Sequence, residues 1–224
     1  MVVYLSSLSK QIESKEDNDE DESNNECKKG RKDCTTLTVW RKSLVFSCNG
    51  FTVIDARGDL AYRVDNYIGH PPELTLMNAS GKPILTMIRR RKKLRLLDDW
   101  LVYEGEVTAS SSSKEAIFCV RKHISISNSN VIAQVFETQS DKKNAAYVIE
   151  GSFLHRSCQM LDKSRRVVAK IKRKEPTNCG ISFGFDVFVL VVKPGFDPGF
   201  AMAMVLLLDQ MFSYGLFNIR RIAD

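Results

Sequence analysis

The stretch Phe183–Tyr214, FGFDVFVLVVKPGFDPGFAMAMVLLLDQMFSY, decides the fold. A Val- and Phe-rich run leads to a Pro/Gly break at Gly195–Gly199, and the nine residues Phe200–Leu208 that follow are all apolar. A helix that is apolar on every side must be buried on every side, in lipid or in protein. Crossing a bilayer takes about 20 apolar residues, and Asp209 and Gln210 end this run well short of that length. The stretch therefore predicts a core helix inside a β-structure, with the break as the turn that admits the chain.

The chain has the size and composition of one large domain with a charged N-terminal arm. It has 224 residues, of which 43% are hydrophobic, and a formal net charge of +6. The first 35 residues carry nine acidic and six basic side chains, so this part is at −3 and the remainder is at +9. A polar, charged segment poor in aromatic residues cannot bury enough apolar surface to fold alone. We expect a disordered acidic arm at 1–35, a folded domain at 36–218 and a short tail at 219–224.

The cysteines and the N-terminus indicate an intracellular protein. Six cysteines are scattered without a CxxC pair, whereas zinc sites usually bring their ligands in close couples. The first ten residues, MVVYLSSLSK, lack a basic segment followed by a long apolar one, so secretion is not expected. We therefore expect reduced thiols, no metal, no cofactor, and a location in the cytoplasm or on the inner face of the plasma membrane, with the nucleus as an alternative.

Three passages read as β-hairpins, each an apolar strand, a polar turn and a more basic or polar strand: Phe51–Asn66, Leu74–Arg91 and Cys158–Lys174. In the first two, Asp55 or Asn78 opens the turn and a glycine closes it. Asp and Asn side chains bond to the backbone just ahead, and glycine accepts a positive φ without steric cost. The third turn has Asp162 but no glycine, so its geometry is left open.

Further strands follow from short runs of β-type residues on both sides of a Ser-rich connection at Thr108–Lys114. They are expected at Ser43–Ser47, Lys93–Leu97, Trp100–Glu106, Ala116–Arg121, Val131–Glu137, Ala145–Glu150 and Ile181–Val192. So many antiparallel strands must hide their edges, and closure into a barrel removes edges altogether. The predicted fold is a mainly β, closed antiparallel barrel of about twelve strands around the buried C-terminal hydrophobic helix Phe200–Phe212.

Three sequence elements resemble the plant LURP-one-related family. They are LTVWRKSLVFSCNGFTVIDARGDLAYRVDNY at Leu37–Tyr67, LMNASGKPILTMIRRR at Leu76–Arg91 and DDWLVYEGE at Asp98–Glu106. The likeness closes with the strand–PGFDPGF–apolar-helix segment and covers about Leu37–Leu216. It implies a tubby C-terminal-like fold, shared with tubby-like proteins and phospholipid scramblases, and a non-enzymatic role with a link to plant defence.

The resemblance also directs attention to lipid. Tubby domains bind phosphoinositides at the inner membrane face, but no local motif here aligns with their lipid-binding residues. The chain also lacks the acidic calcium loop, the palmitoylated cysteine cluster and the C-terminal membrane span of scramblases. Lipid scrambling is therefore not expected. We expect the protein to be a monomer.

Two basic clusters are the candidate anion- or lipid-binding residues. The first is Arg89, Arg90, Arg91, Lys92, Lys93 and Arg95; the second contains Lys163, Arg165, Arg166, Lys170, Lys172, Arg173 and Lys174. Strand alternation puts Lys170, Lys172 and Lys174 on one face and Val167, Ala169 and Ile171 on the other. Such a row could hold phosphates at about 1 kcal/mol per charge near an anionic membrane. The alternative is that these side chains only keep the outer strands in water.

No catalytic pattern accompanies the clusters, so we expect no enzyme and no catalytic residues. His70, His123 and His155 lie in different segments, without HExxH spacing, and there is no GxSxG or phosphate-cradling glycine loop. The adjacent acids Asp98 and Asp99 fit a turn better than an acid–base pair. The leading hypothesis is a signalling or scaffold module that docks on anionic phospholipid. The alternatives are a nucleic-acid-binding regulator using the same charges and a protein-interaction module without a lipid role.

Overall fold

The computed structural model describes residues 34–45, 48–65, 72–91, 98–107, 114–124, 129–139, 144–176 and 183–212, and these ranges hold twelve strands and one helix. The strands are β1 (Thr35–Trp40), β2 (Phe51–Ile54), β3 (Leu60–Val64), β4 (Glu73–Asn78), β5 (Pro83–Arg90), β6 (Asp99–Glu104), β7 (Phe118–Lys122), β8 (Val131–Glu137), β9 (Tyr147–Ser152), β10 (Ser157–Asp162), β11 (Val167–Arg173) and β12 (Val187–Val192), and the helix is α2 (Pro198–Phe212). Residues 1–33 of the expected arm, the expected tail and the strand expected at Lys93–Leu97 lie outside the described residues.

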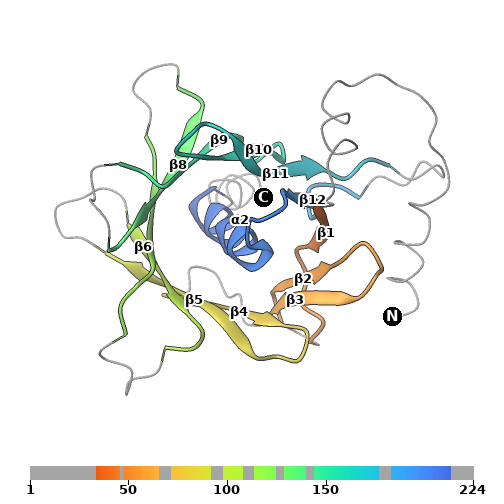
Figure 1. Ribbon diagram of the computed structural model, residues 1–224. Coiled ribbons are helices and arrows are strands. Elements are labelled where there is room, and N and C mark those ends of the chain that lie inside the picture. The colour runs from red at the N-terminus through yellow and green to blue at the C-terminus, as the bar shows by residue number, and fades with distance from the viewer. Residues whose placement is uncertain are drawn as a thin grey trace, which may run out of the picture.

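The strands form a closed antiparallel barrel, as predicted. Each strand pairs with its neighbours in the sequence, and β12 returns to pair with β1, from Thr35 opposite Val192 to Trp40 opposite Val187. Figure 1 shows the ring of strands with α2 at its centre. Because no strand of the ring lacks a neighbour on either side, the barrel presents no open sheet edge within the described residues.

Antiparallel pairing gives the barrel two different ends. The odd-numbered strands all end on the same side of the barrel, which we call the loop end. Their last residues are Trp40, Val64, Arg90, Lys122, Ser152 and Arg173. The odd-numbered strands begin at the other end, which we call the hairpin end. At this end the chain enters α2 after Val192, and it turns after Ile54, Asn78, Glu104, Glu137 and Asp162. The helix therefore runs from the hairpin end to the loop end.

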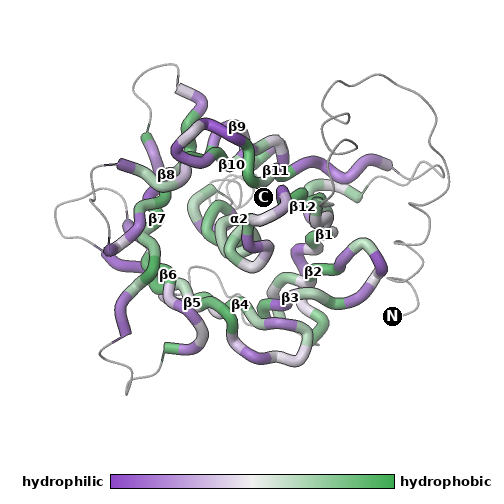
Figure 2. Tube along the Cα trace, in the orientation of Figure 1, coloured by the Kyte–Doolittle hydropathy of each residue, from purple (hydrophilic) through white to green (hydrophobic). Residues whose placement is uncertain are grey.

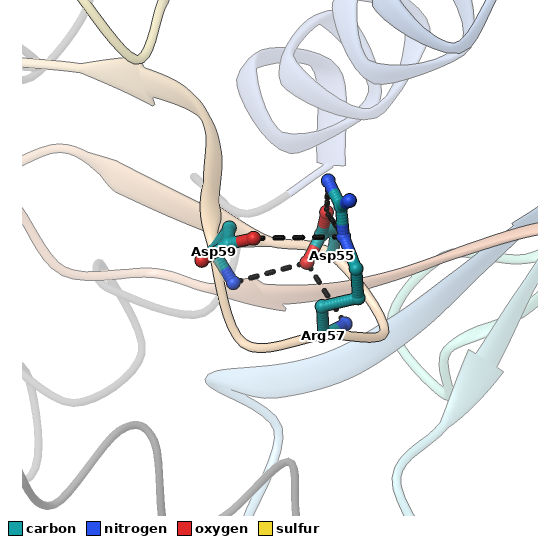
Figure 3. Close-up of polar contacts among 3 residues, drawn as sticks. All are labelled: Asp55, Arg57 and Asp59. Atoms are coloured by element: carbon teal, nitrogen blue, oxygen red, sulfur yellow. Dashed lines mark hydrogen bonds and ion pairs between the residues drawn. The ribbon is translucent and has the colours of Figure 1, made fainter.

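The turn between β2 and β3 has the geometry that the sequence predicts. The Asp55 amide donates to the Asp59 carbonyl at 2.9 Å, and the Asp55 carboxylate accepts the backbone amides of Arg57 and Asp59 (Figure 3). Burial opposes ionisation of Asp55, but the hydrogen bonds from the backbone of Asp59 and Arg57 outweigh it and hold its pKa below the ordinary 3.8. Gly58 takes a φ of 90°, which a glycine adopts without strain.

The other two turns repeat this pattern. Asn78 pairs with Lys82 and Asp162 pairs with Arg166, each through the backbone and through its own side-chain oxygen. Gly81 has a φ of 85°, and in the turn without a glycine it is Arg165 that takes the left-handed conformation, with a φ of 63°. The three predicted hairpins are therefore confirmed, and one backbone geometry serves all three turns.

Helix α2 fills the barrel. Every residue from Gly199 to Gln210 is buried, and the inward-facing side chains of β12, Phe188, Leu190 and Val192, belong to the same core. Figure 2 shows hydrophobic residues along α2 and on the strands around it, and hydrophilic stretches in the connecting turns. At the start of the helix the Asp197 carboxylate accepts the Phe200 amide, with Pro198 as the first helical residue. The predicted core helix and its entry turn are confirmed.

Two predicted strands differ from the structure. No strand forms at Ser43–Val45, the described part of the strand expected at Ser43–Ser47, because the Ser43 hydroxyl accepts the Val45 amide and bends the chain locally. The strand expected at Ile181–Val192 begins only at Val187, because the residues before it form a turn with Gly184 at a φ of 63°. Both errors arise where an apolar run occupies a loop.

Candidate anion-binding site

The two basic clusters lie on opposite walls of the barrel. In the closed strand order, β5 and β11 are six places apart in a ring of twelve. Figure 1 shows them on either side of α2. The clusters therefore do not make one patch on the wall, although both strands end at the loop end.

The described part of the first cluster is largely ion-paired. Arg89, which is only 12% exposed, lies 3.6 Å from the Asp98 carboxylate, and Arg90 lies 3.1 Å from that of Asp99. Arg91 is exposed. The other three candidates, Lys92, Lys93 and Arg95, lie outside the described residues. The charges on β5 thus serve mainly to bind β6.

Asp99 lies in a strand and not in the turn that we expected. It is 2% exposed on β6, and Arg90 on one side and Arg121 of β7 on the other both reach it, the latter at 3.3 Å. Beside this group, burial raises the pKa of the Cys119 thiol. The sequence could not show this arrangement, because it depends on which residues of three strands face one another. The cluster holds β5, β6 and β7 together rather than offering a free charge.

In the second cluster, the cations of the β10–β11 turn also have carboxylate partners. Arg165 contacts Glu150 at 2.8 Å, Arg166 contacts Asp162 at 2.8 Å, and Lys163 approaches Glu137 at 3.6 Å. All three cations belong to the hairpin end. They are therefore neutralised locally and lie away from the rest of the cluster.

The other cations of the second cluster lie along β11 and just beyond it: Lys170, Lys172, Arg173 and Lys174. Within the described residues, none of these four pairs with a carboxylate. The predicted alternation is confirmed from Ala169 to Lys172, since Ala169 and Ile171 are buried while Lys170 and Lys172 are partly or fully exposed. Val167 is only half-buried, and Lys174 lies beyond the end of β11. Arg173 belongs to the inward face but ends the strand, so it is exposed at the mouth of the barrel, over the Phe185 ring at 4.9 Å. Burial lowers the pKa of Lys174, whose ammonium group lies 3.4 Å from the Thr38 hydroxyl.

Three of these cations, Lys172, Arg173 and Lys174, line a cavity at the loop end. Its volume is about 510 Å³, and its lining residues come from the β9–β10 turn and the end of β11: His155, Arg156, Ser157, Ile171, Lys172, Arg173, Lys174, Glu175 and Pro176. Glu175 is the single carboxylate among these nine residues. The cavity is large enough for a phosphorylated headgroup, and its lining favours an anion.

Sequence reasoning missed His155 and Arg156 as partners of the cluster. They precede β10, and the pairing of Cys158 with Ile171 brings them beside the end of β11. Only the strand register carries this information, because no motif links the two segments. The Ser152 hydroxyl contacts Nδ1 of His155 at 2.8 Å and helps to fix its ring.

Arg156 is the buried support of the site. It is 5% exposed and has a φ of 53°, and its guanidinium packs against the rings of Phe153 and Phe188, 4.3 and 4.4 Å from their centroids. Its Nε donates to the Phe185 carbonyl at 3.0 Å. Burial lowers its pKa, and the charge of Asp209 opposes that shift. Arg156 therefore anchors the segment before β12 to the turn before β10.

Two further kinds of site are missing from the described part of the chain. There, no three His, Cys, Asp or Glu side chains gather as a metal site would need. In the same residues, no helix combines the length and apolar character needed to cross a membrane.

Comparison with known proteins places the chain in a family. The LURP-one-related family model matches residues 35–209. Protein LURP-one-related 17 of Arabidopsis thaliana is 50% identical over 188 residues, covering 80% of this chain and 84% of that protein. Protein LURP-one-related 8 of the same plant is 48% identical over 185 residues, covering 81% and 89%. An X-ray structure of an Arabidopsis thaliana protein matches in fold with a TM-score of 0.56 at 23% identity, covering 80% of this chain and 91% of that one. This chain belongs to the LURP-one-related family.

Proposed function

We propose that the protein is a non-enzymatic signalling or scaffold module that docks, as a monomer, on anionic phospholipid headgroups, phosphoinositides above all. The observation that carries the proposal is the cavity at the loop end, where Lys172, Arg173 and Lys174 converge without a carboxylate partner in the described residues. A link to plant defence, which the family resemblance implies, belongs to the same proposal.

The charge pattern favours this site over the others. Cations that already pair with carboxylates, such as Arg89 and Arg165, gain little from a new anion, because binding it must break the existing pair. Lys172 and Arg173 lose no such pair within the described chain. Each cation near an anionic membrane surface contributes about 1 kcal/mol to binding. Neutralising all three should therefore weaken binding roughly 100-fold.

Co-sedimentation with phosphatidylcholine vesicles, with and without phosphoinositide and at graded salt, tests the proposal. We expect phosphoinositide-dependent pelleting that falls with salt and is lost in the variant Lys172→Gln/Arg173→Gln/Lys174→Gln. The matched control removes the same charge from exposed turns of the hairpin end, with Arg57→Gln/Lys82→Gln/Lys163→Gln, and should bind as the wild type does. A soluble inositol phosphate should compete if a headgroup enters the cavity.

Two results would overturn the proposal. One is the absence of phosphoinositide-dependent pelleting at low salt. The other is an equal loss in both triple variants, which would mean that total charge and not the cavity governs binding. Tight, salt-sensitive binding of duplex DNA or RNA without vesicle binding would favour the nucleic-acid alternative instead.

A further inference from the structure

The exposed large hydrophobic side chains of the described chain all lie at one end of the barrel. They are Leu44, Val45, Ile124, Leu154 and Phe185, with exposed fractions between 40% and 57%. Leu44 and Val45 follow β1, Ile124 follows β7, Leu154 lies between β9 and β10, and Phe185 precedes β12, and every one of these positions is at the loop end. A single exposed hydrophobic residue needs no explanation. Their collection at one end does.

These side chains are spread along one half of the rim of the barrel, from β1 through β12 and β9 to β7, and do not form a single patch. The strands β1 and β7, which carry Leu44 and Ile124 at their ends, are six places apart in the ring and so lie on opposite sides of α2 (Figure 2). Leu154 and Phe185 lie on the arc between them, through β9 and β12. A narrow peptide could touch only part of such an arc. A flat, extended surface could contact all of it.

Cations lie close to Leu44, Ile124 and Phe185, in the chain or in space. Lys42 precedes Leu44, and Lys122 precedes Ile124 by two residues. The guanidinium of Arg173 lies over the Phe185 ring. Carboxylates are also present at this end: Asp98 and Asp99 are paired with arginines, Asp186 lies 4.0 Å from Arg41, and Glu73 and Glu175 are exposed. The surface therefore combines apolar side chains with positive charge, which suits an anionic bilayer.

Hydrogen bonds from the barrel hold the segment that carries Phe185 in place. Arg156 Nε binds the Phe185 carbonyl at 3.0 Å, and the Arg41 amide donates to the Asp186 carbonyl at 2.8 Å. Because both donors belong to well-packed parts of the barrel, the phenyl ring remains exposed without collapsing into the core. The hairpin end differs in kind: its exposed turns at Asp55–Asp59 and Asn78–Lys82 are polar.

We propose that the loop end lies flat against an anionic lipid bilayer, with Phe185, Leu154 and Ile124 inserted at the boundary between headgroups and acyl chains and the barrel axis along the membrane normal. This inference rests on the proposed function and adds the orientation and an apolar contribution to it. The cations of β11 then meet the headgroups at the rim of the same contact.

Depth-sensitive fluorescence tests the insertion. The variants Leu154→Trp and Phe185→Trp are compared with Lys82→Trp, at an exposed turn of the hairpin end, on vesicles of phosphatidylcholine with either phosphatidylserine or phosphoinositide and with brominated acyl chains as quencher. We expect a blue shift and quenching above the Trp40 and Trp100 background for the two loop-end probes, and neither for the probe at position 82.

A second pair of variants measures the contribution to affinity. Leu154→Gln/Phe185→Gln should lower vesicle affinity about tenfold, because it removes partial burial of two large apolar side chains, and this loss should persist when salt is raised. The control Ala56→Gln/Ala79→Gln changes two exposed turn residues of the hairpin end and should have no effect.

The outcomes separate the two proposals. Phosphoinositide-dependent pelleting without quenching of either loop-end probe would overturn the insertion and leave the proposed function intact. Quenching on phosphatidylserine vesicles without any phosphoinositide preference would uphold the insertion and overturn the phosphoinositide assignment. Absence of binding to both compositions would overturn both. Self-association that Leu154→Gln/Phe185→Gln abolishes, without quenching on vesicles, would assign the surface to a second copy of the chain and overturn the insertion.

Discussion

The Nε atom of Arg41 lies 3.3 Å from a carboxylate oxygen of Asp209, and this ion pair joins the end of strand β1 to the last turns of the helix inside the barrel. Asp209 is 1% exposed, and an acidic side chain near a helix C-terminus is unfavourable to the helix dipole. Arg41 offsets that charge, and its backbone amide at the same time holds the Asp186 carbonyl. One residue therefore couples the helix to the segment that carries Phe185.

Removing Asp209 alone should destabilise the fold more than removing Asp209 and Arg41 together. The variant Asp209→Ala removes the buried carboxylate that Arg41 contacts, and we expect its free energy of unfolding to fall by about 3 kcal/mol. The double variant Arg41→Met/Asp209→Leu leaves neither charge of the pair and should be the more stable of the two. Urea denaturation followed by circular dichroism measures both. If the double variant is as unstable as Asp209→Ala or worse, the charge pair has a larger net value than this reasoning gives it.

The parts of the fold that the sequence predicted are those with local signals. A run with no polar face identified α2, and Asp197 followed by Pro198 has the residue types of a helix start. Asp55, Asn78 and Asp162 each open a turn through their own backbone bonds, so three hairpins could be found without tertiary information. The strand predicted at Ser43–Ser47 was wrong at Ser43–Val45 for the converse reason, because a loop there has the composition of a strand.

The site depended on information that the sequence does not carry locally. The closed strand order separates the cluster at Arg89 from that at Lys170, and carboxylates elsewhere in the chain neutralise Arg89 and Arg90. His155 joins Lys172 only through the register of β10 against β11. Charge density along the chain therefore found the cations, but only the pairing of strands shows which of them are left for a partner.

The shared turn geometry leads to opposite expectations at two equivalent positions. Gly58 has a φ of 90°, so Gly58→Ala should lower the free energy of unfolding by about 1 kcal/mol or more, because a Cβ is disfavoured there. Arg165 already occupies that conformation with a side chain, so Arg165→Gly relieves a similar strain and loses an ion pair whose arginine is 63% exposed. We expect Arg165→Gly to be no less stable than the wild type.

Thermal and urea unfolding of the two variants, with Lys82→Ala as an exposed control, checks the turn prediction. Equal destabilisation by Gly58→Ala and Arg165→Gly would mean that the ion pair with Glu150, and not the backbone conformation, dominates the third turn.

The buried thiol of Cys158 makes stability depend on alkaline pH. Burial raises the pKa of Cys158 from the ordinary 9.0 to about 12, against a smaller opposing effect of Arg156. Between these two values the folded chain keeps a proton that the unfolded chain has released, so stability falls as pH rises through this window. Since each pKa unit corresponds to about 1.36 kcal/mol, the full decline due to this thiol is on the order of 4 kcal/mol.

The variant Cys158→Ala isolates this contribution. Burial also raises the pKa values of Cys119, Tyr62 and Tyr147, whose effects have the same sign but are common to both proteins. The free energy of unfolding, measured by urea titration at intervals from pH 8 to the highest pH at which the chain still folds, should therefore decline less steeply for Cys158→Ala. The small cavity that alanine leaves lowers its curve by the same amount at every pH. Parallel curves for the two proteins would mean that folding does not raise the pKa of this thiol, and would contradict the prediction.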